Sequence, residues 1–113
     1  MLQTNLEHIE NENQFKELIE KNEKVAVCCG RMGPMCIPVY VIFETLQKEH
    51  PKIRFVDMDF DIPIAEIIKA LPECRGFMGL PFTVYYRNGR VVSATTSIQS
   101  ANQVKSILET VFA

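Results

Sequence analysis

Length, composition and charge exclude several classes of protein. The 113 residues suffice for one domain with its own core, so we expect a single domain over residues 1–113. A net charge of −2 argues against nucleic acid as a partner. No apolar stretch approaches the ~20 residues that a membrane span needs, so we expect no membrane partner either.

The N-terminal residues indicate the compartment. Residues 1–24 are rich in Glu, Asn and Lys and lack the apolar centre of a signal peptide. We therefore predict a cytoplasmic protein, in which the four cysteines are kept reduced.

The first part of the chain predicts a strand, a helix and a second strand. A short edge strand is expected within residues 2–9. Asn11 followed by Gln14 is typical of a capping box, and the helix that begins there should end near Asn22. The continuous apolar run at residues 25–29 predicts a strand that is buried on both faces.

A second helix is predicted to begin at Pro34 and to end near residue 50. Proline suits the first turn of a helix, where the missing N–H is no loss. Pro38 lies further inside, and we expect it to kink the helix near its start. The pattern then predicts a strand over residues 53–58 and a short helix over residues 62–71.

A β-hairpin centred on Asn88-Gly89 is the best-defined element. Both residues tolerate the positive φ of a type I′ turn, and they join predicted strands at residues 82–86 and 91–96. A proline is tolerated where the first of these strands opens, and the Leu80–Pro81 bond is a candidate for the cis form.

The last element is a helix over residues 101–111. Ser100 and Gln103 form a second capping box at its start, and its apolar residues make one stripe. The complete order is β-α-β-α-β-α-β-β-α. It predicts an α/β fold with a central mixed β-sheet and helices on both faces, in which the hairpin adds antiparallel strands.

Three groups of residues then match a known family. Met32-Gly33-Pro34-Met35 follows the strand at residues 25–29, Asp57-Met58-Asp59-Phe60-Asp61 ends the next strand, and Gly79-Leu80-Pro81-Phe82-Thr83 leads into the hairpin. With the order of elements, these residues resemble the thioredoxin family over nearly the whole chain. The resemblance implies the thioredoxin fold and a cis bond before the proline, beside the active site.

The chain departs from this family at the residues that carry its chemistry. Thioredoxins have Cys-Gly-Pro-Cys where this chain has Met-Gly-Pro-Met, and the family's buried acid and tryptophan fall on Ala26 and Arg31. Disulfide exchange needs one thiolate to attack and a second thiol to resolve the mixed disulfide. A thioether cannot ionise, so neither Met32 nor Met35 can replace these groups. We expect no ordinary dithiol activity.

The leading hypothesis is therefore a thioredoxin-like protein that binds a protein or peptide client. In the family, an extended peptide lies between the helix start and the cis proline and pairs with the backbone of the preceding residue. Met35 replaces a mostly buried cysteine, so we expect its side chain in the core; a core position is also open for Met78. The expected binding residues are Met32, Gly33, Pro34, Met35, Gly79, Leu80 and Pro81.

Two further hypotheses come from the same region. Cys36 could act alone as a monothiol thiol–disulfide oxidoreductase or redox sensor, because free N–H groups and the dipole at a helix start lower a thiol pKa. A one-residue register change would also place it at the family's resolving position. The matching family position is usually exposed, which favours access. The alternative interpretation is an unpaired surface cysteine without a role. Alternatively, the Met-rich face is an interface in a homo-oligomer.

The other three cysteines are not expected to react. Cys28 and Cys29 should face opposite sides of a buried strand and fill the core. Cys74 could meet Cys36 only if its loop folds toward the helix start. We expect no zinc site, because the sequence has no C-x-x-C pair.

A last cluster consists of three carboxylates at alternate positions. Their spacing places them on one side of a strand, but carboxylates at a strand end more often cap a helix or meet water. We therefore predict neither a metal nor a cofactor. The three residues are Asp57, Asp59 and Asp61.

Overall fold

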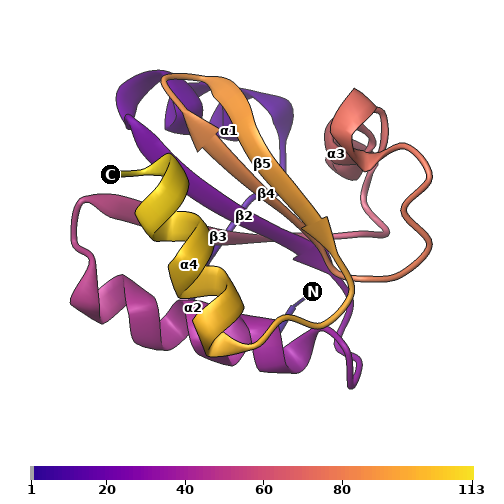
Figure 1. Cartoon of the computed structure of the whole chain (residues 1–113). Coiled ribbons are helices and arrows are strands. Elements are labelled where there is room, and N and C mark those ends of the chain that lie inside the picture. The colour runs from indigo at the N-terminus through magenta and orange to yellow at the C-terminus, as the bar shows by residue number, and fades with distance from the viewer. Residues whose placement is uncertain (1) are drawn as a thin grey trace.

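A computed structural model describes residues 2–113, which form one five-stranded sheet between two layers of helices (Figure 1). The strand order is β1-β3-β2-β4-β5. β3 pairs in parallel with β1 and β2, whereas β4 pairs antiparallel with β2 and β5. The predicted α/β fold with a mixed sheet is confirmed. The strands are β1 (Glu7–His8), β2 (Lys24–Gly30), β3 (Ile53–Asp59), β4 (Phe82–Arg87) and β5 (Arg90–Thr96).

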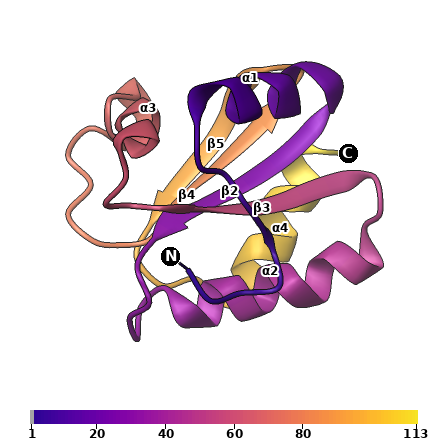
Figure 2. The same cartoon turned by 180° about the vertical axis from the view of Figure 1, so that it is seen from behind.

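Helices cover both faces of this sheet. α2 (Ile37–Glu49) and α4 (Ala101–Val111) lie on one face, and α1 (Glu12–Lys21) and the short α3 (Glu66–Lys69) lie on the other (Figures 1 and 2). Side chains of β2 alternate between the two layers, as the pleat of a strand requires. Cys28 packs in the core beneath α2 and α4 and Cys29 in the core beneath α1 and α3, as predicted.

The helix starts are capped largely as expected. The Asn11 side chain accepts a hydrogen bond from the backbone N–H of Gln14 at 2.8 Å. The Gln14 side chain turns instead to the N–H of Glu10 and the carbonyl of His8, so this capping box is only half made. At Ser100 both reciprocal bonds of the capping box are present.

The start of α2 differs from the prediction. The helix begins at Ile37, and residues 34–36 form a turn in which the N–H groups of Cys36 and Ile37 both bond to the carbonyl of Gly33. Pro38 is thus the second residue of the helix and not an internal one. The predicted kink is wrong, because a proline in the first turn removes no hydrogen bond from the helix.

Two other elements are shorter than predicted. The N-terminal strand consists only of Glu7–His8. The helix expected over residues 62–71 is reduced to α3, flanked by 3₁₀ turns at Pro63–Ala65 and Pro72–Cys74. Both 3₁₀ turns begin at a proline, and Pro72 cannot donate the hydrogen bond that would extend α3.

The hairpin is confirmed in detail. Asn88 and Gly89 have φ values of 54° and 79°, as a type I′ turn requires. The Leu80–Pro81 peptide bond is cis, as the resemblance implied. This hairpin places Leu80–Pro81 opposite the end of β2, because Cys29 of β2 is paired with Phe82 of β4.

Candidate functional site

Two loops that are distant in the sequence meet at Gly30, the last residue of β2. A Cβ atom on Gly30 would lie 2.7 Å from Cys36 Sγ, 2.9 Å from Tyr40 Oη and 3.1 Å from Pro81 Cβ. The absence of a side chain therefore lets the helix start and the cis proline approach each other. Sequence reasoning missed this role, although a glycine at the end of a strand is itself a sign of close approach.

The backbone of Leu80 is left open at this meeting point. Its neighbours are held by the end of β5: Thr96 Oγ1 donates to the carbonyl of Gly79, and the N–H of Ser97 donates to that of Pro81 at 3.1 Å. Within residues 2–113, the N–H and carbonyl of Leu80 itself have no hydrogen-bond partner. The residue before the cis proline thus presents a free donor and a free acceptor.

Three exposed methionines lie in the two loops that meet at Gly30. The exposed fractions of Met32, Met35 and Met78 are 42%, 43% and 97%. The expectation that Met35 is in the core is wrong, and so is a core position for Met78. Because α2 starts late, Met35 lies in the preceding turn, and Cys36 takes the buried position beneath it.

Cys36 is consequently not the accessible thiol that the matching family position led us to expect. It is 3% exposed, and its sulfur accepts a hydrogen bond from the Arg31 N–H at 3.4 Å. Burial raises the pKa of Cys36, although the hydrogen bonds from Arg31 and Tyr40 oppose the shift. The expectation of a lowered pKa is therefore wrong, because desolvation outweighs the groups at the helix start.

The remaining thiols are equally enclosed. Cys28, Cys29 and Cys74 are buried and free, and burial raises the pKa of each, that of Cys29 to about 12. Cys74 packs in the core beneath α1 and α3, whereas Cys36 packs in the opposite one. The structure does not bring these two sulfurs together.

An ion pair that the sequence did not reveal forms one rim of the site. The Arg31 guanidinium donates two hydrogen bonds to the Asp61 carboxylate, at 2.8 and 2.7 Å. It also lies over the Phe60 ring, 5.1 Å from the centroid, and the Lys69 ammonium lies 4.0 Å from the same centroid. The bonds from Arg31 hold the pKa of Asp61 below its usual range.

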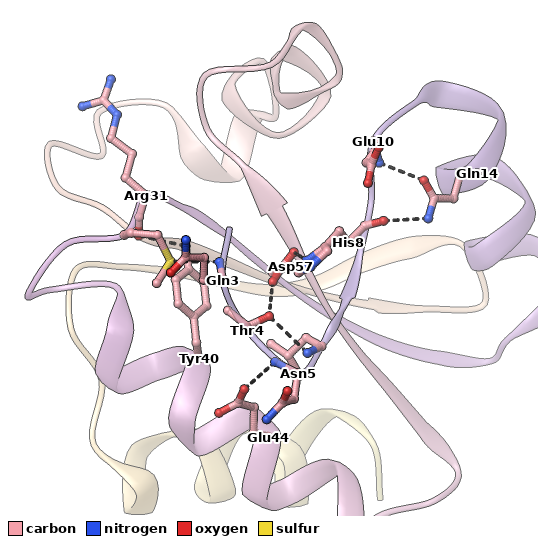
Figure 3. A network of polar contacts seen from close by, with 12 residues as sticks. Gln3, Thr4, Asn5, His8, Glu10, Gln14, Arg31, Tyr40, Glu44 and Asp57 are labelled. Atoms are coloured by element: carbon pink, nitrogen blue, oxygen red, sulfur yellow. Dashed lines mark hydrogen bonds and ion pairs between the residues drawn. The ribbon is translucent and has the colours of Figure 1, made fainter. Parts of the chain in front are cut away.

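Asp57 belongs to a separate polar network under the N-terminal segment (Figure 3). Its fully buried carboxylate accepts from Thr4 Oγ1 at 2.5 Å and lies 2.7 Å from His8 Nδ1. Burial raises the pKa of Asp57, although these two partners favour its ionised form.

The three carboxylates singled out from the sequence do not converge. Asp57 is enclosed near β1, whereas Asp61 is at the rim with Arg31, and Asp59 accepts from the N–H of Asp61. In the described part of the chain, no group of three or more His, Cys, Asp or Glu residues could hold a metal ion.

Comparison with solved structures decides the fold. Plasmodium falciparum thioredoxin superposes with a TM-score of 0.77 at 20% identity, covering 94% of this chain and 99% of that one. The chain has the thioredoxin fold. Mitochondrial thioredoxin 3 from Saccharomyces cerevisiae has a TM-score of 0.77 at 19% identity, with coverages of 94% and 95%. A cysteine-to-serine mutant of Entamoeba histolytica thioredoxin has a TM-score of 0.76 at 21% identity, with coverages of 93% and 98%.

Comparisons of the sequence add no closer relative. No model of a protein family matches the chain, and no curated protein matches it. No helix within residues 2–113 has the length and apolar character to cross a membrane. A thioredoxin fold occurs in the mitochondrial protein named above, so the cytoplasmic location stays a prediction.

Proposed function

We propose that this thioredoxin-fold protein binds an extended segment of a protein or peptide client and does not exchange disulfides with it. The observation that carries the proposal is the unpaired backbone of Leu80 in a loop that meets, at Gly30, the loop with the exposed side chains of Met32 and Met35. Thioethers stand where the family has its dithiol, and all four thiols are buried. The groups left at the surface, the Leu80 backbone and the methionine side chains, are suited to binding.

The geometry supports recognition of an extended backbone. A client strand can donate to the Leu80 carbonyl and accept from its N–H, which is the way that extended peptides add to open backbone edges. The methionine side chains are flexible and polarizable, so they can contact apolar client side chains of different shapes. A groove between Met32–Met35 and Gly79–Pro81 is part of this proposal, and it would favour apolar, β-forming segments over a single sequence.

A labelled decapeptide of alternating valine and serine tests this proposal by fluorescence anisotropy. We expect Met32→Asp to weaken its binding at least roughly tenfold, because a charge in an apolar contact must be desolvated. Val92→Asp is the matched control: Val92 is 41% exposed but lies on β5, near the hairpin turn and away from Pro81. Equal affinities for the two variants would refute the proposed groove.

A second form of the peptide tests the role of the Leu80 backbone. Methylation of its central amide nitrogens removes the donors and leaves the side chains in place. We expect much weaker binding of this peptide, because the Leu80 carbonyl then loses its partner. Undiminished binding would show that the backbone of Leu80 is not used.

The monothiol alternative requires Cys36 to react despite its burial. One observation still favours this hypothesis: Cys36 Sγ and Pro81 Cβ lie close together, since both would contact a Cβ on Gly30. We expect the protein to leave insulin disulfides intact and Cys36 to be alkylated by iodoacetamide more slowly than free cysteine at pH 7. Alkylation of Cys36 at the rate of a free thiol, or insulin reduction at the rate of a normal thioredoxin, would favour redox catalysis.

Sedimentation velocity distinguishes the homo-oligomer hypothesis from client binding. If the Met-rich face joined copies of this chain, Met32→Asp would shift the wild-type species to a smaller one. The client proposal expects the sedimentation coefficient to be the same for both.

A further inference from the structure

The surface of this protein presents its sulfur as thioethers and not as thiols. In the part of the chain that the structure describes, all four cysteines are at most 3% exposed. Three methionines, in contrast, are between 42% and 97% exposed and lie in the two loops that meet at Gly30, whereas Met58 in β3 is fully buried. Oxidants that reach this surface therefore meet Met32, Met35 and Met78 first.

We propose that Met32 and Met35 form a reversible oxidation site, and that peroxide closes the groove to its client by converting them to sulfoxides. This inference rests on the proposed client binding for its consequence, but the oxidation itself does not. Met78 is oxidised as well, because it is the most exposed of the three. The groove would thus respond to oxidants although it has lost the dithiol.

The chemistry needs only a peroxide and the thioether. A lone pair on Sδ attacks one oxygen of hydrogen peroxide, an S–O bond forms and the O–O bond breaks. The leaving oxygen takes up the hydroxyl proton of the transferred oxygen and departs as water. The sulfur loses two electrons and the peroxide gains them, and enzymes that reduce methionine sulfoxide restore the thioether.

Two features of the structure connect the oxidation to binding. A sulfoxide is polar, so its burial under an apolar client segment leaves a strong acceptor without a partner. Met32 Sδ also accepts the N–H of Gln3 at 3.4 Å, a weak bond to sulfur. A sulfoxide oxygen is a stronger acceptor than the thioether, so oxidation would hold the Met32 side chain more firmly toward the N-terminal segment, where this bond already places it.

Mapping of the oxidation by peptide mass spectrometry tests the site itself. The folded protein is treated with hydrogen peroxide, quenched at intervals and digested. We expect Met78 to gain one oxygen fastest, Met32 and Met35 next, and Met58 at least roughly tenfold more slowly than these two, since oxidation follows exposure. The same treatment in urea should remove the difference. Met58 reacting as fast in the folded protein, or the cysteines reacting before Met32 and Met35, would overturn the proposal.

Binding of the valine–serine decapeptide before and after peroxide tests the consequence. We expect at least roughly tenfold weaker binding after oxidation and recovery after treatment with methionine sulfoxide reductases. The double variant Met32→Leu/Met35→Leu is the control. The ratio of its affinity for the decapeptide after peroxide to its affinity before peroxide should be near one. An equal loss in this variant would assign the effect to Met78 or to a thiol and overturn the proposal. If the untreated wild type fails to bind, the proposed function and the switch both fall, whereas the mapping still decides the oxidation site.

Discussion

At the scale of single residues, the packing around Gly30 determines whether the Cys36 thiol is exposed. Gly30 has no side chain, and this allows Cys36 Sγ, Tyr40 Oη and Pro81 Cβ to converge within 3.1 Å of where a Cβ would be. The same convergence buries the Cys36 thiol and raises its pKa. At this scale, the close packing that brings the two loops together also removes the Cys36 thiol from the surface.

Gly30→Ala tests this packing. The added methyl group overlaps three neighbours at once, so we expect the free energy of unfolding to fall by about 1–3 kcal/mol, as for other overpacked cores. Gly33→Ala is the matched control, because no atom outside its chain neighbours lies within 4 Å of the position of a Cβ there. Urea unfolding of both variants measures the difference, and equal stabilities would contradict the packing described.

Asp57→Asn tests the buried carboxylate. Burial raises the pKa of Asp57 above its unfolded value near 4. The folded state then binds the proton more tightly than the unfolded state, so the stabilising contribution is complete below about pH 4 and is lost as the pH rises through the folded pKa. Asparagine does not titrate and lacks this dependence.

We therefore expect the difference in unfolding free energy, wild type minus Asp57→Asn, to decrease as the pH rises from about 4 toward neutrality. Urea unfolding at several pH values measures it. An increase over the same range would show that the hydrogen bonds from Thr4 and His8 outweigh burial. Thr4→Val removes one of these bonds without removing the carboxylate and should make the decrease steeper.

At the scale of elements, the way in which each helix begins determines which side chains lie at the surface. α4 begins with a complete capping box, and α1 with half of one. α2 has no side-chain cap, and the loop before it is instead closed by two bonds to the carbonyl of Gly33. The delayed start of α2 is what exposes Met35 and buries Cys36, so the site depends on where this helix begins.

Ser100→Ala tests the cap of α4. Its hydroxyl accepts from the N–H of Gln103 at 3.1 Å, and we expect its removal to lower stability by about 1 kcal/mol. Ser106→Ala is the control, because Ser106 is exposed within the same helix and alanine is the better helix former. Thermal or urea unfolding should therefore show a loss for the first variant and no loss for the second.

At the scale of the whole molecule, the sheet sets the hierarchy of stability. β2 is the central strand, is paired on both sides and is buried from Val25 to Gly30. β1 is a two-residue edge strand, and β5 is an edge strand whose residues are only partly buried. The proposed groove lies at the carboxyl end of β2, the strand that we expect to be the most stable.

Amide hydrogen exchange tests this hierarchy. We expect the N–H groups of Val25–Cys29 to exchange at rates set by global unfolding, because both neighbouring strands must separate first. The amides of β1 should exchange faster, through local opening of the edge. NMR or mass spectrometry measures both, and equal protection of β1 and β2 would contradict the expectation.

Local patterns were sufficient to predict much of the fold. The apolar run at residues 25–29, the caps at Asn11 and Ser100 and the Asn88-Gly89 turn each depend on a few adjacent residues, and the structure confirms them. The central mixed sheet follows from their order along the chain. The predictions that were wrong concern Pro38, the helix at residues 62–71 and the exposure of Met35, Met78 and Cys36, where neighbouring signals compete.

The sequence by itself determined the mixed-sheet architecture and the presence of methionine at both cysteine positions of the motif, because residue types and their local spacing decide both. Only the tertiary structure decided which sulfur is exposed, which carboxylate is buried and which backbone groups are left open. Those properties depend on contacts between segments such as Gly30, Cys36 and Pro81, which are far apart in the chain and meet only when the sheet is assembled. Desolvation at these contacts, and not the identity of the residues, determines how the cysteines of this protein behave.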